Sequence, residues 1–162
     1  MPHVDNHNAP VVVGDEIETS LAFLGYLRDG VGRKLNGLNE EQARLALVPS
    51  GTCLLGVVKH LTRVETYWIQ RRFAGREIDR VADGDGFSLA AGDTVASVRR
   101  DYEMAAALTD EIASDADPEQ PLAFGSHGLT LRWALAHVAE ETARHAGHAD
   151  ILRELLDGVT GR

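Results

Sequence analysis

The chain has 162 residues and a formal net charge of −9, from 25 acidic and 16 basic side chains. This length suits a single domain, and the negative charge argues against nucleic-acid binding, which needs a basic surface. No apolar run approaches the roughly 20 residues that cross a membrane, and the N-terminus lacks the pattern of a signal peptide. One cysteine, Cys53, excludes an internal disulfide. We therefore expect a cytoplasmic protein without nucleic-acid or membrane partners.

Residues 1–13 show no regular spacing of apolar side chains, so we expect a flexible N-terminal arm there. The pattern that follows predicts one helical domain over residues 14–158. In its first helix, which begins at Asp15 and ends near Leu35, apolar side chains recur every three or four positions. A short helix capped by Asn39 comes next.

This short helix is expected to end near Leu47. A second long helix should begin after an N-cap at Ser50 or Thr52 and end near Phe73. Residues 75–92 are rich in glycine and aspartate and have no periodic pattern, which is typical of an irregular connection. We expect this connection to cross the length of the domain.

The second half of the sequence continues the helical spacing and contains no sustained strand alternation. Four long amphipathic helices with one long connection predict an all-α fold, a four-helix bundle with a long crossover between its second and third helices. The remaining expected elements are a third helix capped by Asp93 or Thr94 and ending near Ile112, a loop over 115–128, and a fourth helix from Thr130 to near Leu156.

The last helix carries three histidines within residues 137–148. A helix turns by about 100° per residue, which places Glu141 and His145 among the apolar residues of its inner face. His137 and His148 fall at the edge of that face. Burying an unpaired carboxylate is costly, so Glu141 must be protonated, paired or bound to a cation.

The second long helix supplies a third candidate ligand, His60, which borders its buried face by the same count. Together, His60, Glu141 and His145 offer two imidazoles and one carboxylate, a set that suits zinc, nickel, iron(II) or manganese. Three protein ligands leave a position open for water or substrate. In the alternative interpretation no metal binds, the histidines are ordinary, and an arginine pairs with Glu141. Three arginines could serve as that partner: Arg144, Arg63 and Arg71.

Other side chains are expected near this candidate metal site without binding the ion. His148 should lie beside His145, where a place at the rim or as a hydrogen-bond partner of the ligand is favoured over a role as a fourth ligand. His137 is too far along the helix axis to share the ion, and we expect it to line the pocket with Trp68. Cys53 is interpreted as a small buried side chain.

At these residues the sequence resembles the DinB/YfiT-like superfamily of metal-binding four-helix bundles. Its greatest similarity is to the branch that contains the N-terminal domain of mycothiol-dependent maleylpyruvate isomerase and many actinobacterial proteins. The resemblance covers nearly the whole chain after residue 13. The segments that carry it are 49–52, 55–61, 64–68 and 133–153.

In this superfamily the second helix provides one metal ligand and the last helix two, four residues apart, with glutamate at the middle position in the isomerase-like branch. The resemblance therefore implies the same ligands: His60, Glu141 and His145. It also implies a divalent-metal-dependent thiol S-transferase in which the metal, zinc first, holds a low-molecular-weight thiol such as mycothiol as the thiolate.

Two other functions stay open from the sequence. The bundle could be a non-enzymatic, stress-related binding module whose metal is structural or absent, or a metal-assisted hydrolase. The expected partners of the leading interpretation are a small thiol and an electrophile. Because such bundles often pair through an outer helix face, a homodimer is also an open alternative.

Overall fold

A computed structural model describes residues 9–78, 86–125 and 128–160. The expectation of an all-α bundle is confirmed, since these residues are mostly helical and form no strand beyond one isolated bridge. Most of the expected N-terminal arm lies outside the described residues, and residues 9–13 contain no helix. The elements are α1 (Glu16–Arg33), α2 (Glu40–Arg44), α3 (Leu54–Glu65), the π-helix η1 (Thr66–Phe73), α4 (Val95–Ala113) and α5 (Leu131–Asp157).

Side-chain caps determine where most of these helices begin. Asp15, Asn39 and Thr94 each accept a hydrogen bond from the third residue of the following helix, and each helix returns the bond in a capping box. Such a cap typically contributes about 1 kcal/mol. Asn39 is the predicted cap of α2, and Thr94 is one of the two predicted for α4.

Two boundaries differ from the expectation. The N-cap of α3 is Cys53 and not the predicted Ser50 or Thr52, because the Cys53 Sγ accepts the hydrogen bond of the Gly56 N–H at 3.4 Å. The hydroxyl groups of Ser50 and Thr52 instead lie 3.0 Å from each other. Helix α2 ends at Arg44, three residues before the expected end, because Leu45 adopts an extended conformation.

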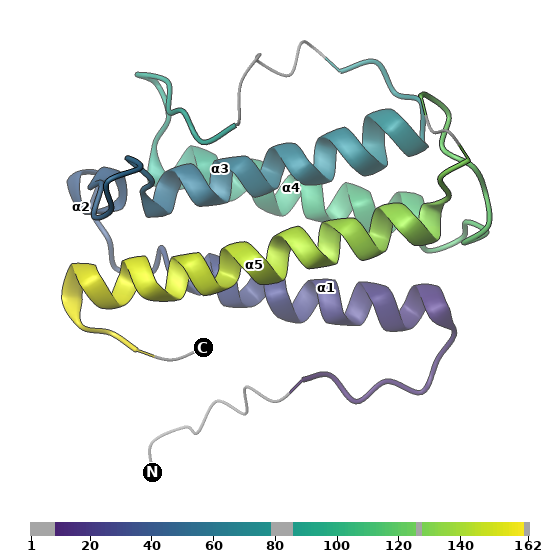
Figure 1. Ribbon diagram of the computed structural model, residues 1–162, viewed down its shortest axis with the longest axis horizontal. Helices are drawn as coiled ribbons and strands as arrows, with labels where there is room; N and C mark the ends of the chain where they lie inside the picture. Colours follow the sequence, from purple (N-terminus) through teal and green to yellow (C-terminus); the bar gives the residue numbers. More distant parts are fainter. Residues whose placement is uncertain (1–8, 79–85, 126–127, 161–162) are drawn as a thin grey trace.

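The four long helices run in two directions (Figure 1). Helices α1 and α5 point one way, and α3 and α4 point the other. Because α3 and α4 are parallel, the chain must return along the whole bundle between them, and the described parts of the expected crossover, residues 75–78 and 86–92, contain no helix. Helix α5 packs against both α1 and α3, and α3 packs against α4.

The core consists of two apolar clusters, one towards each end of the bundle. Leu55 and Leu61 of α3 are completely buried in one, and Leu131 and Leu135 of α5 are buried in the other. Each such side chain contributes about 2 kcal/mol through its removal from water. None of the described helices is both long and apolar enough to cross a membrane.

The predicted second long helix changes its hydrogen-bond pattern after Glu65. From Thr66 to Phe73 the chain forms a π-helix, and the N–H of Ala74 still bonds to the carbonyl five residues earlier, on Ile69, at 2.9 Å. A π-turn contains one more residue than an α-turn, so it shifts the faces to which later side chains point. Such insertions are frequent at functional sites.

Candidate metal centre

The structure brings the three predicted ligands together between α3 and α5. The Nε2 atom of His60 lies 3.4 Å from Oε2 of Glu141, and Nε2 of His145 lies 3.5 Å from the same oxygen. One ligand atom from each residue can be chosen so that all three lie within 4.8 Å of one another. These distances are longer than good hydrogen bonds, and they leave room for an ion at the common point.

Helix geometry explains the convergence. Glu141 and His145 are one turn apart on α5, so their side chains share a face. Helix α3 packs against this face in the opposite direction and presents His60 from across the interface. All three side chains are largely removed from solvent, with exposed fractions of 16%, 14% and 9% for His60, Glu141 and His145.

The protonation states suit a cation. Burial, followed by the nearby His60, lowers the pKa of His145 to about 4, so this imidazole is neutral at pH 7 and has a lone pair available. Burial alone would raise the pKa of Glu141, but His60, His145 and Arg144 outweigh it and lower that pKa below its usual range. A neutral imidazole and an ionised carboxylate are the forms in which these residues bind metals.

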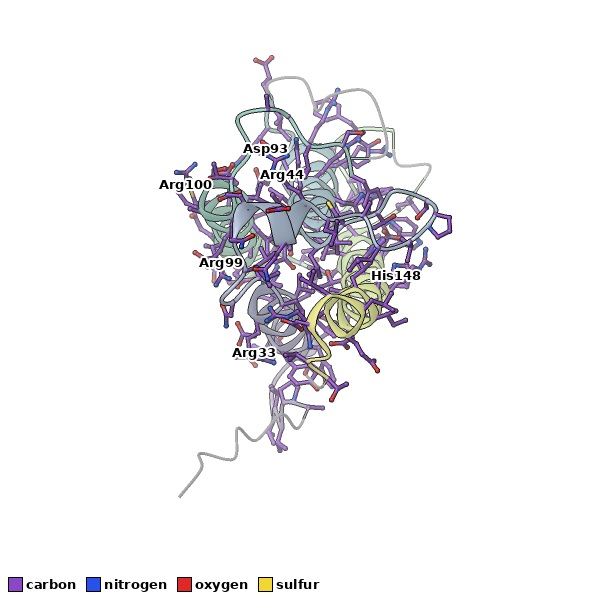
Figure 2. All side chains as sticks on the ribbon, turned by 90° about the vertical axis from the view of Figure 1, so that its left-hand side faces the viewer. Arg33, Arg44, Asp93, Arg99, Arg100 and His148 are labelled. Atoms are coloured by element: carbon purple, nitrogen blue, oxygen red, sulfur yellow. The ribbon has the colours of Figure 1, made fainter. Side chains whose placement is uncertain are left out.

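His148 contacts the ligand His145 on the side opposite Glu141. Their Nδ1 atoms lie 3.1 Å apart, so one of the two rings must carry its proton there. If His145 donates that proton, its Nε2 atom is left bare and faces Glu141. His148 itself is exposed at the outer edge of α5 (Figure 2). The predicted place of His148 beside the ligand agrees with this contact.

His137 and Trp68 lie together in a pocket of about 380 Å³ that opens beside Glu141 and His60. The His137 ring stacks on Trp133 at 5.0 Å and meets the edge of Trp68 at 4.8 Å. His137 also approaches Glu140 and Glu141, but Glu140 is exposed and pairs with Arg144. The pocket therefore has an aromatic wall next to the candidate ligands.

The site also contains Phe87, a residue of the crossover that the sequence pattern did not indicate. Its ring stacks on His60 with centroids 4.1 Å apart and planes 8° apart. Two glycines permit this approach: a Cβ atom on Gly56 would lie 2.7 Å from the Phe87 carbonyl oxygen, and one on Gly86, which has φ +81°, would lie 2.8 Å from Arg63. A lone aromatic residue within a polar glycine-rich segment was the available signal.

The arginines of the alternative interpretation occupy different places. Arg144 reaches Glu141 at 3.4 Å, although it is half-exposed and also pairs with Glu140. Arg63 lines the pocket beside His60, and Arg71 lines a separate hollow near the end of η1. An ion pair of Glu141 with an exposed arginine is thus present, and it contributes little in water-accessible surroundings.

The comparisons with known proteins agree with this architecture. The family model for mycothiol-S-transferase matches residues 19–158. A crystal structure of a conserved protein from Enterococcus faecalis superposes with a TM-score of 0.71 over 91% of this chain and 100% of its own length, at 13% sequence identity, which shows a shared fold. Among curated proteins, none matches the sequence. Because the family model spans nearly all of the helical domain, the chain belongs to the mycothiol-S-transferase family of DinB-like proteins.

Proposed function

We propose that the protein is a divalent-metal-dependent S-transferase that uses a low-molecular-weight thiol, mycothiol in the first instance. The observation that carries this proposal is the convergence of His60, Glu141 and His145 within 4.8 Å beside an open pocket. The match to the mycothiol-S-transferase family supports the choice of thiol. Two nitrogens and one carboxylate oxygen fit zinc best, and nickel, iron or manganese also accept this set.

The charge of the site suits this chemistry. A bound divalent ion would lower the pKa of a thiol and favour its thiolate, the nucleophilic form. Glu141 would offset one of the two positive charges of the ion, and an imidazole ligand carries no negative charge, so one positive charge would remain for an incoming anion. In the transfer, the thiol loses its proton to solvent, and the sulfur electron pair forms a bond to carbon. In a substitution, that carbon expels a leaving group. In an addition to a double bond, the neighbouring carbon gains a proton.

A second candidate follows from the contact of Arg144 with Glu141. This pair compensates the carboxylate without any ion, so the bundle could serve as a non-enzymatic binding module with a structural metal or none. In that case the protein would keep its stability after chelation and would not accelerate thiol conjugation.

Elemental analysis of protein purified without a histidine tag tests the proposal. We expect about one equivalent of metal in the wild type and none in His145→Ala, whereas His7→Ala, which precedes the helical domain, should retain the metal. The metal-loaded wild type should then accelerate conjugation of mycothiol with 1-chloro-2,4-dinitrobenzene, with release of chloride. Loading without any thiol-dependent turnover would favour the binding module.

A further inference from the structure

A second hollow, of about 860 Å³, lies where η1 ends and the loop after α4 passes beside it. The backbone N–H of Phe124 in that loop bonds to the carbonyl of Arg72 at 3.2 Å and so holds the loop against η1. Three of its lining side chains are arginines within six positions: Arg71, Arg72 and Arg76. We call this hollow the arginine groove.

Arg72 is held in place by neutral acceptors. Its Nε atom donates to the Phe124 carbonyl at 2.6 Å, one Nη donates to the Tyr67 hydroxyl at 2.9 Å, and the other donates to the Gly125 carbonyl. The guanidinium also lies over the ring of Trp68, 5.3 Å from its centroid. None of these partners carries a negative charge, so the positive charge of Arg72 is fixed in position without being neutralised.

The other two arginines add to this charge. Within the described part of the chain, the side chains of Arg71 and Arg76 make no hydrogen bond or ion pair, and among the lining residues the only carboxylate is Glu77. In a chain with net charge −9, three arginines and one acid among the described lining residues are a local reversal of sign. Guanidinium groups bind carboxylates through two parallel hydrogen bonds, which makes arginine suited to this ligand.

The arginine groove adjoins the pocket of the candidate metal centre. Tyr67 lines both hollows, and Trp68, on which Arg72 rests, lines the metal pocket. An extended molecule could therefore place an apolar or unsaturated part against Trp68 and an anionic end among the arginines. The π-helical segment supplies Tyr67, Trp68, Arg71 and Arg72, and so positions both walls.

We propose that the arginine groove binds the carboxylate of the electrophilic substrate, so that this transferase acts on organic anions. The inference rests on the proposed function where it calls the bound anion a substrate, whereas binding of the anion in the groove needs no metal. Recognition comes from Arg71 and Arg76 around the fixed charge of Arg72, while the aromatic residues next to them hold the carbon skeleton.

Calorimetric titration with two matched probes, cinnamate and its neutral amide cinnamamide, tests this proposal. The wild type should bind cinnamate at least about tenfold more tightly than cinnamamide, because one charge-assisted contact is worth about that factor. The double variant Arg71→Gln/Arg76→Gln should lose most of this preference. The control Arg100→Gln removes an exposed arginine of α4 (Figure 2) that does not line the groove, and it should keep the preference.

His145→Ala separates this inference from the proposed function. If the groove holds the carboxylate, the preference for cinnamate persists in His145→Ala, whether or not the wild type binds metal or catalyses transfer. If the preference disappears in that variant, the carboxylate binds at the metal and the inference is wrong. Equal binding of the two probes by the wild type, or an unchanged preference in the double arginine variant, would also overturn it.

Discussion

Two clusters of ionisable side chains with largely buried members differ in how closely their charged groups contact one another. On one side, Arg28 of α1 holds Glu65 of α3 by two hydrogen bonds of 2.7 and 3.0 Å and Asp110 of α4 by one of 2.7 Å. On the other side, His60 and His145 approach Glu141 no closer than 3.4 Å. We refer to the first as the arginine triad and to the second as the candidate metal centre.

The contrast shows how a binding site differs from a structural ion pair in the same core. Burial alone would lower the pKa of Arg28, but Glu65 and Asp110 outweigh it and raise that pKa above its ordinary value. The charge of Arg28 is therefore matched by carboxylates within the protein, without a bound ion. In the candidate metal centre one carboxylate faces two histidines, of which His145 is neutral at pH 7, and the contacts of Glu141 with the two rings are longer, at 3.4 and 3.5 Å. Ligand atoms that converge on one point without a close contact between them indicate a place for a cation.

The largest effect is expected from breaking the arginine triad. Glu65→Gln keeps the size of the side chain but leaves the charge of Arg28 with only the half-exposed Asp110. Because removal of one partner from a buried pair leaves the other uncompensated, we expect a loss of about 3–5 kcal/mol in the free energy of unfolding of the metal-free protein. Urea denaturation followed by circular dichroism measures it.

Two controls accompany this variant. The same chemical change at the other cluster, Glu141→Gln, should cost less than about 1 kcal/mol in the metal-free protein, since no close hydrogen bond is lost. Replacing both charges of the triad, in Arg28→Met/Glu65→Met, should restore part of the stability. Equal losses in Glu65→Gln and Glu141→Gln would remove the distinction between the two clusters.

Metal affinity should show the opposite order. Glu141→Gln removes the only negative ligand of the candidate metal centre, so we expect its zinc dissociation constant to rise at least about 100-fold, beyond the usual effect of a residue that only supports a ligand. Competition with a chromophoric chelator gives this constant. Glu65→Gln, measured under conditions where it is folded, should bind zinc like the wild type. A zinc affinity in Glu141→Gln equal to that of the wild type would mean that this carboxylate pairs with Arg144 and does not bind the ion.

Part of this contrast could be predicted from the sequence. Helix α5 is regular over 27 residues, so a constant turn of about 100° per residue correctly placed Glu141 and His145 on one face. His60 lies before the π-helix on α3, where the same count still holds. The family resemblance led to the same three residues.

The arginine triad was not predictable in this way. Glu65 resembles a surface glutamate, because its partner Arg28 is 37 positions away and nothing local signals the contact. The π-helix was also missed, since a continuous α-helical count cannot register an added residue per turn, and this change affects where Arg72 points. Phe87 reaches His60 only through the path of the crossover. Glu65 and Phe87 were missed because each depends on a tertiary contact.

A smaller effect is expected from His148, which contacts the ligand His145 without facing the metal position. Partners of this kind orient the ring and determine which nitrogen carries the proton, and their loss typically weakens binding by tenfold or somewhat more. We expect His148→Ala to raise the zinc dissociation constant about tenfold. His137→Ala, whose ring stacks on Trp133, should leave the constant unchanged. Equal effects of the two substitutions would mean that His148 does not orient His145.

The smallest effect is expected at a charge pair near the surface, in which Nζ of Lys59 lies 2.7 Å from Oδ2 of Asp93. Burial alone would raise the pKa of Asp93, but hydrogen bonds from Lys59 and the Ala90 N–H outweigh it and lower that pKa below 3.8. A carboxylate whose pKa is lowered in the folded protein stabilises the fold at pH values above its ordinary pKa. This stabilisation is lost as the pH falls through the lowered pKa of the folded state.

Asp93→Asn should therefore cost less than about 1 kcal/mol at pH 7, the usual limit for a partly exposed pair. The difference from the wild type should narrow as pH falls from 5 towards 3, because protonated Asp93 also loses its charge. Unfolding in urea at several pH values measures this difference. The control is Asp101→Asn, which changes an exposed side chain of α4. A difference that is constant with pH would mean that Asp93 acts only as a hydrogen-bond acceptor for Ala90 and contributes nothing through its charge.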